Sequence, residues 1–419
     1  MNQAQAPLFR RDFTLVVIGQ VISLFGNAIL RFALPLYLLR QTGSSALFGA
    51  VGAAAFVPAV LCSPVGGVVA DRVNKRNIMA ALDFSTAGLI LIFTLLLGQV
   101  PLTPLMIACL MLLYGIAGAY QPAVQASIPL LAGAEQLTAA NAVINMVNTL
   151  AGLLGPVAGG VLFAAFGIRP ILWVSMGCFL LSAVMELFIR IPHRHRAAEG
   201  RIMAIVARDL REGWRFVRRE KPVFLSVMLV LALFNLVLSA ALIVGIPVAV
   251  VQALGMSDVH LGITQGAMGL GGLSGGVLAA CLGGRLELRR GSAVLLAASM
   301  TAAGMAAALA PGVPARVGWW VMTAMSFAIM VLSTLLVVVL SAAVQRQIPP
   351  ELLGKVMAFI MAVSNCASPL GQAVYGVLFE GCPPWAVLLG AAAAATAAAA
   401  YSRRVFRRLD AAVAPAPER

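Results

Sequence analysis

Long apolar runs separated by short polar turns fill the chain from residue 13 to residue 401. A helix needs about 20 mostly apolar residues to cross roughly 30 Å of hydrocarbon. Runs of that length therefore predict transmembrane helices, and the pattern predicts an all-α polytopic membrane protein. The twelve runs are Phe13–Leu39, Leu47–Ala70, Ile78–Val100, Leu102–Tyr120, Ala139–Phe166, Ile171–Ile191, Val223–Val251, Leu261–Leu282, Ser292–Ala310, Val317–Leu340, Val356–Phe379 and Trp385–Tyr401.

The Lys and Arg residues of the connecting turns predict the orientation of these helices. If the N-terminus is inside, the inner segments contain most of the cations, whereas the outer turns contain only Arg40, Arg169 and Arg316. Cytoplasmic loops carry an excess of positive charge. We therefore expect both termini to be cytoplasmic and the protein to lie in the cell (inner) membrane. The polar stretch Met1–Asp12 has no apolar core, so we expect no cleaved signal peptide.

Composition supports a membrane protein and disfavours other classes. Of the 419 residues, 61% are hydrophobic and 11% charged, against about 25% charged in soluble domains. The net charge of +14 is concentrated in loops on one side, so it does not indicate nucleic-acid binding. We find no nucleotide-binding loop, metal-ligand cluster or paired catalytic carboxylates, and so predict no enzyme, metal or cofactor. The six cysteines are scattered and suit small packing residues.

The second half of the chain repeats the first. Residues 123–129 (AVQASIP) recur as residues 343–349 (AVQRQIP), with five of seven positions identical, and residues 160–163 (GVLF) recur as residues 376–379. Each echo falls on the equivalent helix, which predicts two six-helix parallel repeats. We expect an N-terminal bundle at 1–191, a linker at 192–221, a C-terminal bundle at 222–402 and a basic cytoplasmic tail at 403–419.

The linker contains apolar residues at helical spacing, opposite a row of arginines. The apolar positions include Leu210, Trp214 and Val217, and the basic positions include Arg208 and Arg211. This pattern predicts an amphipathic helix suited to the inner membrane surface. A calmodulin-binding or nucleic-acid-binding helix is the alternative.

The polar turn between the second and third runs contains a dense charge motif, made of Gly67, Asp71, Arg72, Lys75 and Arg76. It resembles the loop 2–3 signature of the major facilitator superfamily, with Asn74 in place of the second glycine. Asn also tolerates a left-handed turn. The resemblance implies the major facilitator fold. Because parallel repeats place the end of the second run beside the start of the eleventh, where a helix N-terminus favours a carboxylate, we expect Asp71 to act as an inner gate. An ordinary positive cytoplasmic loop is the alternative.

The fifth run contains Gly155, Pro156, Gly159 and Gly160. Proline bends a helix, and glycines let a neighbouring helix approach at backbone distance. The segment resembles the antiporter signature of the superfamily's drug exporters. A packing kink without any bearing on transport direction is the alternative.

Polar and ionisable residues inside apolar runs are candidate functional residues, because their burial in hydrocarbon is costly. Asp83 is either a proton acceptor or a partner of Arg72 or Arg76. Arg31 either faces a cavity or extends to the outer surface, and Glu186 suits a helical pair with Arg190. The candidates for coupling or for a polar cavity wall are Asn27, Arg31, Asp83, Asn141, Asn145, Asn148, Glu186, Gln265 and Asn365.

Further segments, among them residues 18–26 and 209–213, resemble the superfamily branch of macrolide-efflux and enterobactin-exporter proteins. This resemblance implies proton-coupled export of amphipathic small molecules, drug-like or siderophore-like. We expect the protein to act as a monomer in the lipid bilayer. Drug antiporters often carry an arginine in the fourth helix, whereas Leu110–Tyr120 contains no charge. A lipid or lysolipid flippase of the same fold and a non-transporting receptor or scaffold are the alternatives.

Overall fold

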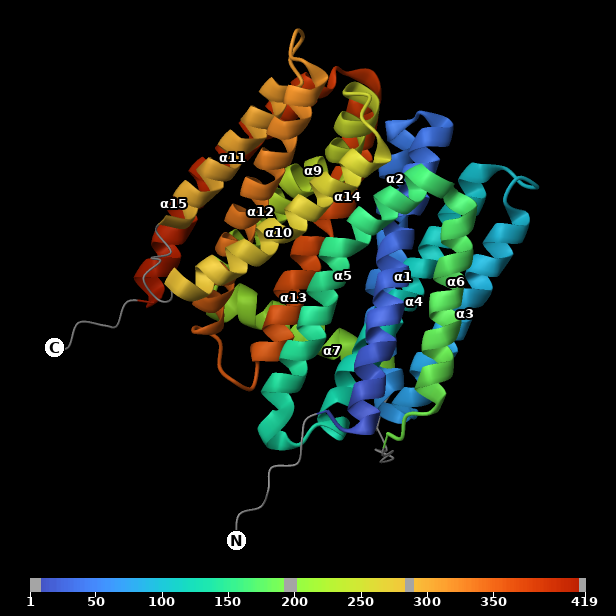
Figure 1. Ribbon diagram of the computed structural model, residues 1–419. Coiled ribbons are helices and arrows are strands. Elements are labelled where there is room, and N and C mark those ends of the chain that lie inside the picture. The colour runs from blue at the N-terminus through green and yellow to red at the C-terminus, as the bar shows by residue number, and fades with distance from the viewer. Residues whose placement is uncertain (1–8, 192–201, 283–289, 414–419) are drawn as a thin grey trace, which may run out of the picture. The chain divides into compact units, whose positions relative to one another are not determined.

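The computed structural model describes residues 9–191, 202–282 and 290–413. Within them, twelve helical segments are long and apolar enough to cross a membrane, which confirms the all-α prediction (Figure 1). The elements are α1 (Arg11–Thr42), α2 (Ser45–Arg72), α3 (Lys75–Leu96), α4 (Leu102–Leu131), η1 (Ala134–Gln136), α5 (Leu137–Phe166), α6 (Ile168–Leu187), α7 (Ile202–Arg215), η2 (Phe216–Glu220), α8 (Val223–Phe234), η3 (Asn235–Ser239), α9 (Ala240–Pro247), η4 (Val248–Ala253), α10 (Asp258–Leu282), α11 (Gly291–Ala308), α12 (Ala315–Gln345), α13 (Leu353–Asn365), α14 (Ala367–Gly381) and α15 (Pro384–Val413).

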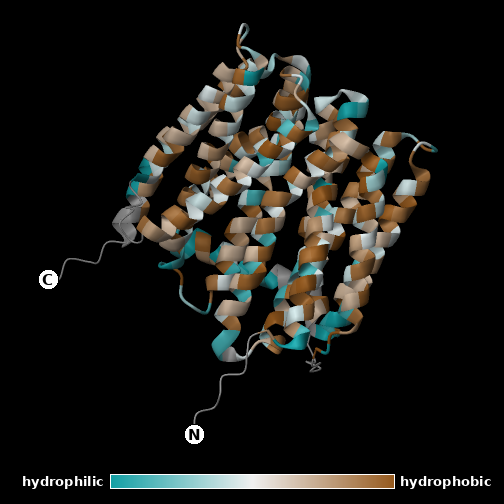
Figure 2. Ribbon diagram, in the orientation of Figure 1, coloured by the Kyte–Doolittle hydropathy of each residue, from teal (hydrophilic) through white to brown (hydrophobic). Residues whose placement is uncertain are grey.

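Apolar side chains cover the outside of the helices as well as the interior. Figure 2 shows brown, hydrophobic residues along most of each helix and teal residues mainly near helix ends. Large side chains such as Val277, Trp320 and Leu370 are more than 60% exposed. Exposure of this extent suits a surface solvated by lipid rather than by water.

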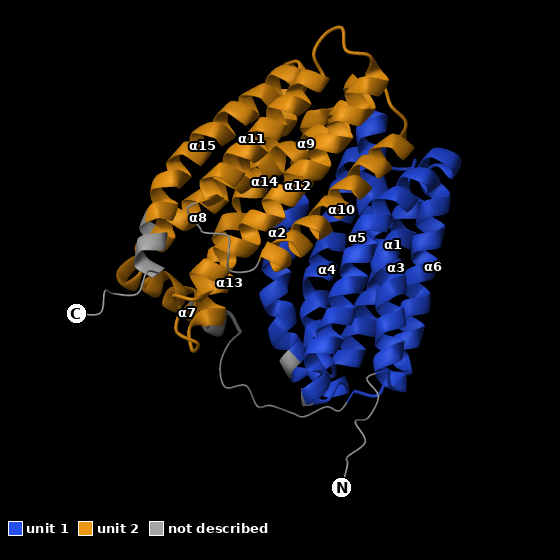
Figure 3. Cartoon of the chain, turned by 60° about the vertical axis from the view of Figure 1, so that its left-hand side comes forward, with its two compact units in different colours: residues 1–42, 54–202 blue, residues 43–53, 203–419 orange. Residues whose placement is uncertain are grey.

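The chain forms two compact units, and the second of them includes a short segment from the first half of the sequence. Unit 1 comprises residues 1–42 and 54–202, and unit 2 comprises residues 43–53 and 203–419 (Figure 3). Helix α2 is therefore shared, because its first nine residues, Ser45–Ala53, group with unit 2 and the rest with unit 1.

In unit 1, α1 is the central helix and contacts α4, α5 and α6. A Cβ atom at Gly155 would collide with Ala28, and one at Gly159 would lie 2.9 Å from Cδ1 of Phe32. These glycines allow α5 to pack against α1 at backbone distance. The prediction of a close helix contact at this motif is confirmed.

In unit 2, α12 contacts α10 and α11, and α15 contacts α11 and α8. The buried core includes Phe224, Leu336, Val356 and Phe406, each at most 3% exposed. Helix α15 continues to Val413 and so extends beyond Tyr401, where the apolar run ends.

Two predicted runs are not single α-helices. The seventh consists of α8 and α9 with π-helical segments η3 and η4. The eleventh is interrupted at Cys366, between α13 and α14. Pro369 explains this break, because a proline lacks the N–H that would bond to the carbonyl four residues earlier, at Asn365.

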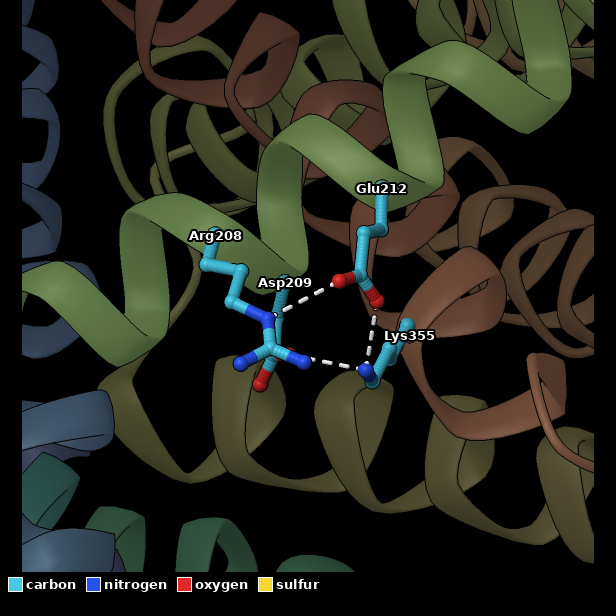
Figure 4. Close-up of polar contacts among 4 residues, drawn as sticks. All are labelled: Arg208, Asp209, Glu212 and Lys355. Carbon is cyan, nitrogen blue, oxygen red and sulfur yellow. Dashed lines mark hydrogen bonds and ion pairs between the residues drawn. The ribbon is translucent and has the colours of Figure 1, made fainter. Parts of the chain in front are cut away.

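The predicted linker helix is present as α7, and it docks on α13 within unit 2. Lys355 Nζ lies 2.6 Å from Glu212 Oε2 and 3.2 Å from Asp209 Oδ1, and Arg208 Nε lies 2.9 Å from Glu212 Oε1 (Figure 4). Beside this cluster, a Cβ atom on Gly213 would lie 3.0 Å from Cβ of Phe359. Trp214, on the apolar face of α7, also packs against Phe359 of α13, with ring centroids 6.0 Å apart.

Candidate functional site

The loop 2–3 motif joins the end of α2 to the start of α3. The glycine that allows close helix packing here is not the one that the signature contains. A Cβ atom on Gly66 would lie 2.6 Å from Cα of Ala119, whereas one on Gly67 would lie 4.0 Å from Pro122. Gly66, rather than Gly67, therefore allows α2 to approach α4. The side chain of Asp71 lies outside the described residues, so its proposed gating contact stays a prediction.

Asn74 does not adopt the left-handed turn expected of a glycine substitute. Its φ is −60°, and its side-chain oxygen accepts the backbone N–H of Arg76 at 3.1 Å. Asn74 is thus the N-cap of α3, a position where Asn is among the preferred residues. Asn74 therefore takes the place of the second glycine of the signature without a left-handed backbone.

The three asparagines of α5 contribute little to the interior of unit 1. The side-chain amides of Asn141 and Asn148 donate to carbonyls of their own helix, at 2.8 and 3.0 Å. Asn141 and Asn145 are exposed, and none of the three lines the cavity of unit 1 described next.

Unit 1 contains a cavity of about 220 Å³ lined by residues of α1, α2, α3, α4 and α6. It brings together three sequence candidates, Asn27, Arg31 and Asp83. The Arg31 guanidinium lies 3.8 Å from the ring centroid of Tyr114, an arrangement favourable for a cation–π contact. Arg31 thus faces the cavity. Its positive charge lies beside Tyr114 of α4, within the segment Leu110–Tyr120 that has no charged residue.

Asp83 is a buried carboxylate in the wall of this cavity. Its side chain is 2% exposed, and Oδ1 accepts a hydrogen bond of 3.1 Å from Ser23 Oγ. Its Oδ2 has no hydrogen-bond partner among the described residues. The alternative of an ion pair with Arg72 or Arg76 is wrong, since Arg76 instead bonds to Asn77 and Asp83 pairs with neither.

Glu186 of α6 is a second buried carboxylate, on a hydrogen-bonded chain that crosses the unit. Gln20 Nε2 donates to Tyr120 Oη at 2.6 Å, and Tyr120 Oη donates to Glu186 Oε1 at 2.7 Å. The predicted helical pair with Arg190 is wrong, because α6 ends at Leu187 and Oε2 of the fully buried Glu186 has no partner among the described residues.

The two carboxylates are connected through α1. Gln20 and Ser23 are three residues apart and so lie on one face of that helix. Gln20 donates to Tyr120, which donates to Glu186. Ser23 donates to Asp83. Sequence reasoning missed Gln20, Ser23 and Tyr120. The available signal was their polarity within apolar runs, but only the fold shows that they converge on the two acids.

Unit 2 contains a smaller and mostly apolar cavity of about 110 Å³, lined by residues of α8, η3, α12 and α13. Asn365 lines it, as does Asn235, whose amide donates to the carbonyl of Ser364 at 3.2 Å. This amide thereby satisfies a carbonyl near the break between α13 and α14. Gln265 of α10 is half-buried and does not line this cavity.

Comparisons with known proteins agree with this architecture. The chain is 24% identical over 409 residues to macrolide efflux protein A of Streptococcus pyogenes, covering 96% of this chain and 98% of that protein. Its fold is similar to a bacterial homologue of the human lysosomal transporter Spinster, with a TM-score of 0.73, 15% identity and coverage of 99% and 100%. It is also similar to a mutant of the nucleoside transporter NupG, with a TM-score of 0.75, 14% identity and coverage of 95% and 99%.

Among the described residues, twelve helical segments are long and apolar enough to cross a membrane, which defines a multi-pass membrane protein. The sequence profile that matches the chain is that of a transporter family rather than an enzyme family. A sequence profile described as Major Facilitator Superfamily matches residues 16–372, and the chain belongs to that superfamily. The resemblance inferred from the loop 2–3 and fifth-helix motifs is confirmed at the level of the family.

Proposed function

We propose that this protein is a secondary active transporter that exports amphipathic small molecules by proton antiport with alternating access. Efflux proteins among its relatives support the direction of transport. We also propose that both termini face the cytoplasm, that the membrane is the cell (inner) membrane, and that the transporter acts as a monomer.

The observation that carries the proposal is the placement of Asp83, between a cavity and the interior of unit 1. An ionised carboxylate with an unpartnered oxygen is costly away from water, and ionisable residues within the membrane often serve proton relays. Asp83 has one bonded oxygen and one oxygen without a partner among the described residues, so it has room for a proton. A substrate group entering the cavity meets the same residue, which gives proton and substrate a shared site.

Glu186 extends this site into a two-carboxylate system. Tyr120 donates to Glu186 and accepts from Gln20, so the hydroxyl fixes the orientation of both side chains. Because Gln20 and Ser23 share one face of α1, a displacement of this helix changes the surroundings of both acids together. We propose that this coupling links proton exchange to the movement of α1.

The two repeats support a mechanism of alternating access. We propose that the two six-helix halves rock around a substrate site, as the parallel repeats of such transporters do. Asp71, at the inner end of α2, is proposed to close the inner side by contacting the start of α13, because a helix N-terminus stabilises a nearby carboxylate.

The test is transport in proteoliposomes with an imposed pH gradient, using a macrolide and an amphipathic cation as substrates. The wild-type protein should accumulate substrate only when the gradient is imposed. Asp83→Asn should abolish gradient-driven transport but retain substrate binding, and Glu186→Gln should weaken the dependence on the gradient. Glu135→Gln, at an exposed position in η1, is the control and should transport as the wild type does. Full gradient-driven transport by Asp83→Asn would contradict the proposed coupling site.

A further inference from the structure

The start of α2 is capped by a carboxylate from a helix more than 300 residues away. Oε2 of Glu380 accepts the backbone N–H of Ala46 at 3.0 Å and the hydroxyls of Ser44 and Ser45 at 3.0 and 3.1 Å. Ser44 Oγ in turn accepts the backbone N–H of Leu47 at 3.1 Å. Two of the free N–H groups at this helix end are thus bonded to side chains.

The Glu380 carboxylate replaces the acidic residue of a capping box, which the sequence at the start of α2 lacks. In a capping box, a Ser or Thr at the N-cap is followed three residues later by a Glu or Gln. Ser44 occupies the N-cap position, but the residue three positions on is Leu47. The acidic group therefore comes from Glu380, the penultimate residue of α14.

The position of Glu380 is unfavourable for its own helix. A negative charge is destabilising near a helix C-terminus and stabilising near an N-terminus. Glu380 thus gains its favourable electrostatic environment from α2, and only while the two helix ends are together. The carboxylate links the two helices rather than stabilising α14 itself.

The helix surfaces below this cap fit each other at backbone distance. A Cβ atom on Gly49 would collide with the carbonyl of Gln372 and lie 2.9 Å from Cα of Gly376. A Cβ atom on Gly376 would lie 2.8 Å from the carbonyl oxygen of Ser45. Gln252 Nε2 also donates to the carbonyl of Gly43 at 2.8 Å. The start of α2 is therefore held in one specific position on unit 2.

We propose that Glu380 is a positioning residue that latches the start of α2 to α14 on the outer side of the membrane. The contact lies within unit 2, whereas the rest of α2 belongs to unit 1, and in this proposal it opens when one half moves against the other. Glu380 would then be the outer counterpart of Asp71, since each acid is the penultimate residue of its helix. This inference rests on the proposed alternating access.

The experiment measures the latch directly, in the full-length protein in lipid nanodiscs without substrate or pH gradient. Spin labels are placed at Ala50→Cys and Val377→Cys, two exposed positions on α2 and α14, after the six native cysteines are replaced. Glu380→Gln should lower the ratio of short-distance to long-distance populations roughly tenfold, because charge-assisted hydrogen bonds are lost. Glu135→Gln should leave the distances unchanged.

A second variant separates the latch from simple helix capping. Leu47→Glu, added to Glu380→Gln, supplies a capping box within α2 itself. We expect it to restore hydrogen-exchange protection of the first turn of α2 without restoring the short distance. If it restores both, or if Glu380→Gln leaves the distances unchanged, the latch is overturned.

Further readouts keep the latch and the proposed function distinguishable. If Glu380→Gln does not fold, Glu380→Asp, which keeps the charge with a shorter reach, should give an intermediate distance shift; wild-type distances would overturn the latch.

A distance shift together with absent transport in the wild type contradicts only the proposed function. Normal transport with distances insensitive to Glu380→Gln contradicts only the latch.

Discussion

At the scale of single residues, the environment of each charged side chain is set by partners distant in the sequence. Asp83 and Glu186 are buried and bonded to neutral hydroxyls, whereas Glu212 lies at the surface between two cations. Residues of one chemical type therefore have different roles in one chain: two suit proton exchange, and the third stays ionised and fixes a helix in place.

Glu212 makes a pH-dependent contribution that a melting experiment can detect. Hydrogen bonds from Lys355 and then Arg208 lower the pKa of the Glu212 carboxyl to about 2, against about 4.3 in an unfolded chain. A lowered folded-state pKa stabilises the protein above the unfolded value, and the contribution is lost as pH falls from about 4.3 towards about 2.

Glu212→Gln should accordingly lower the melting temperature at neutral pH, and the difference from wild type should shrink as pH falls through that window. Glu220→Gln, in η2 and exposed, is the matched control and should show no such pH dependence. A difference between Glu212→Gln and wild type that is constant with pH would show that the side chain contributes through its shape and not its charge.

At the scale of the helices, glycines decide which surfaces meet. On α5, Gly155 and Gly159 face Ala28 and Phe32 of α1, whereas Gly152 has no atom of another element within 4 Å of its Cβ position. A glycine is therefore required for helix contact at position 155, whereas position 152, one turn earlier, has room for a side chain.

This difference predicts opposite effects of one substitution. Gly155→Ala should destabilise unit 1 by about 1–3 kcal/mol, because an added methyl group forces α5 away from α1. Gly152→Ala should be neutral or stabilise by about 0.5–1 kcal/mol, because alanine favours a helix interior over glycine. Urea or thermal unfolding of the two variants in detergent provides the measurement. Equal effects would show that the motif does not mediate this contact.

At the scale of the whole molecule, the two units share one helix. The first nine residues of α2 group with unit 2 and the remainder with unit 1. Polar groups hold the start of this helix to α14, because the Glu380 carboxylate bonds to Ser44, Ser45 and Ala46.

Alternating access predicts reciprocal distance changes at the two membrane faces. Spin labels at Leu130→Cys and Ala342→Cys report the inner side, and labels at Phe166→Cys and Trp320→Cys report the outer side; all four positions are exposed. When substrate or pH changes, one pair should lengthen as the other shortens. Distances that stay constant under every condition would contradict the rocking of the halves.

The sequence by itself determined the number of spans, the fold class and the family, because hydrophobic length and local motifs are properties of neighbouring residues. The twelve runs match the twelve candidate spans, and the glycine motif of α5 indicated a close contact before its partner was known. The sequence also marked Asp83 and Arg31 as unusual, since a charge within an apolar run is visible without a structure.

Only the tertiary structure decided which partners these residues have. Tyr120 and Glu186 are 66 residues apart, and Glu380 and Ala46 are 334 residues apart, so no local pattern joins them. Sequence spacing favoured Arg190 for Glu186 and Arg72 or Arg76 for Asp83, because it assigns partners within one helix or turn. In the folded chain, hydroxyl groups from neighbouring helices occupy those positions, since bundle packing brings residues together by helix face and depth rather than by sequence separation.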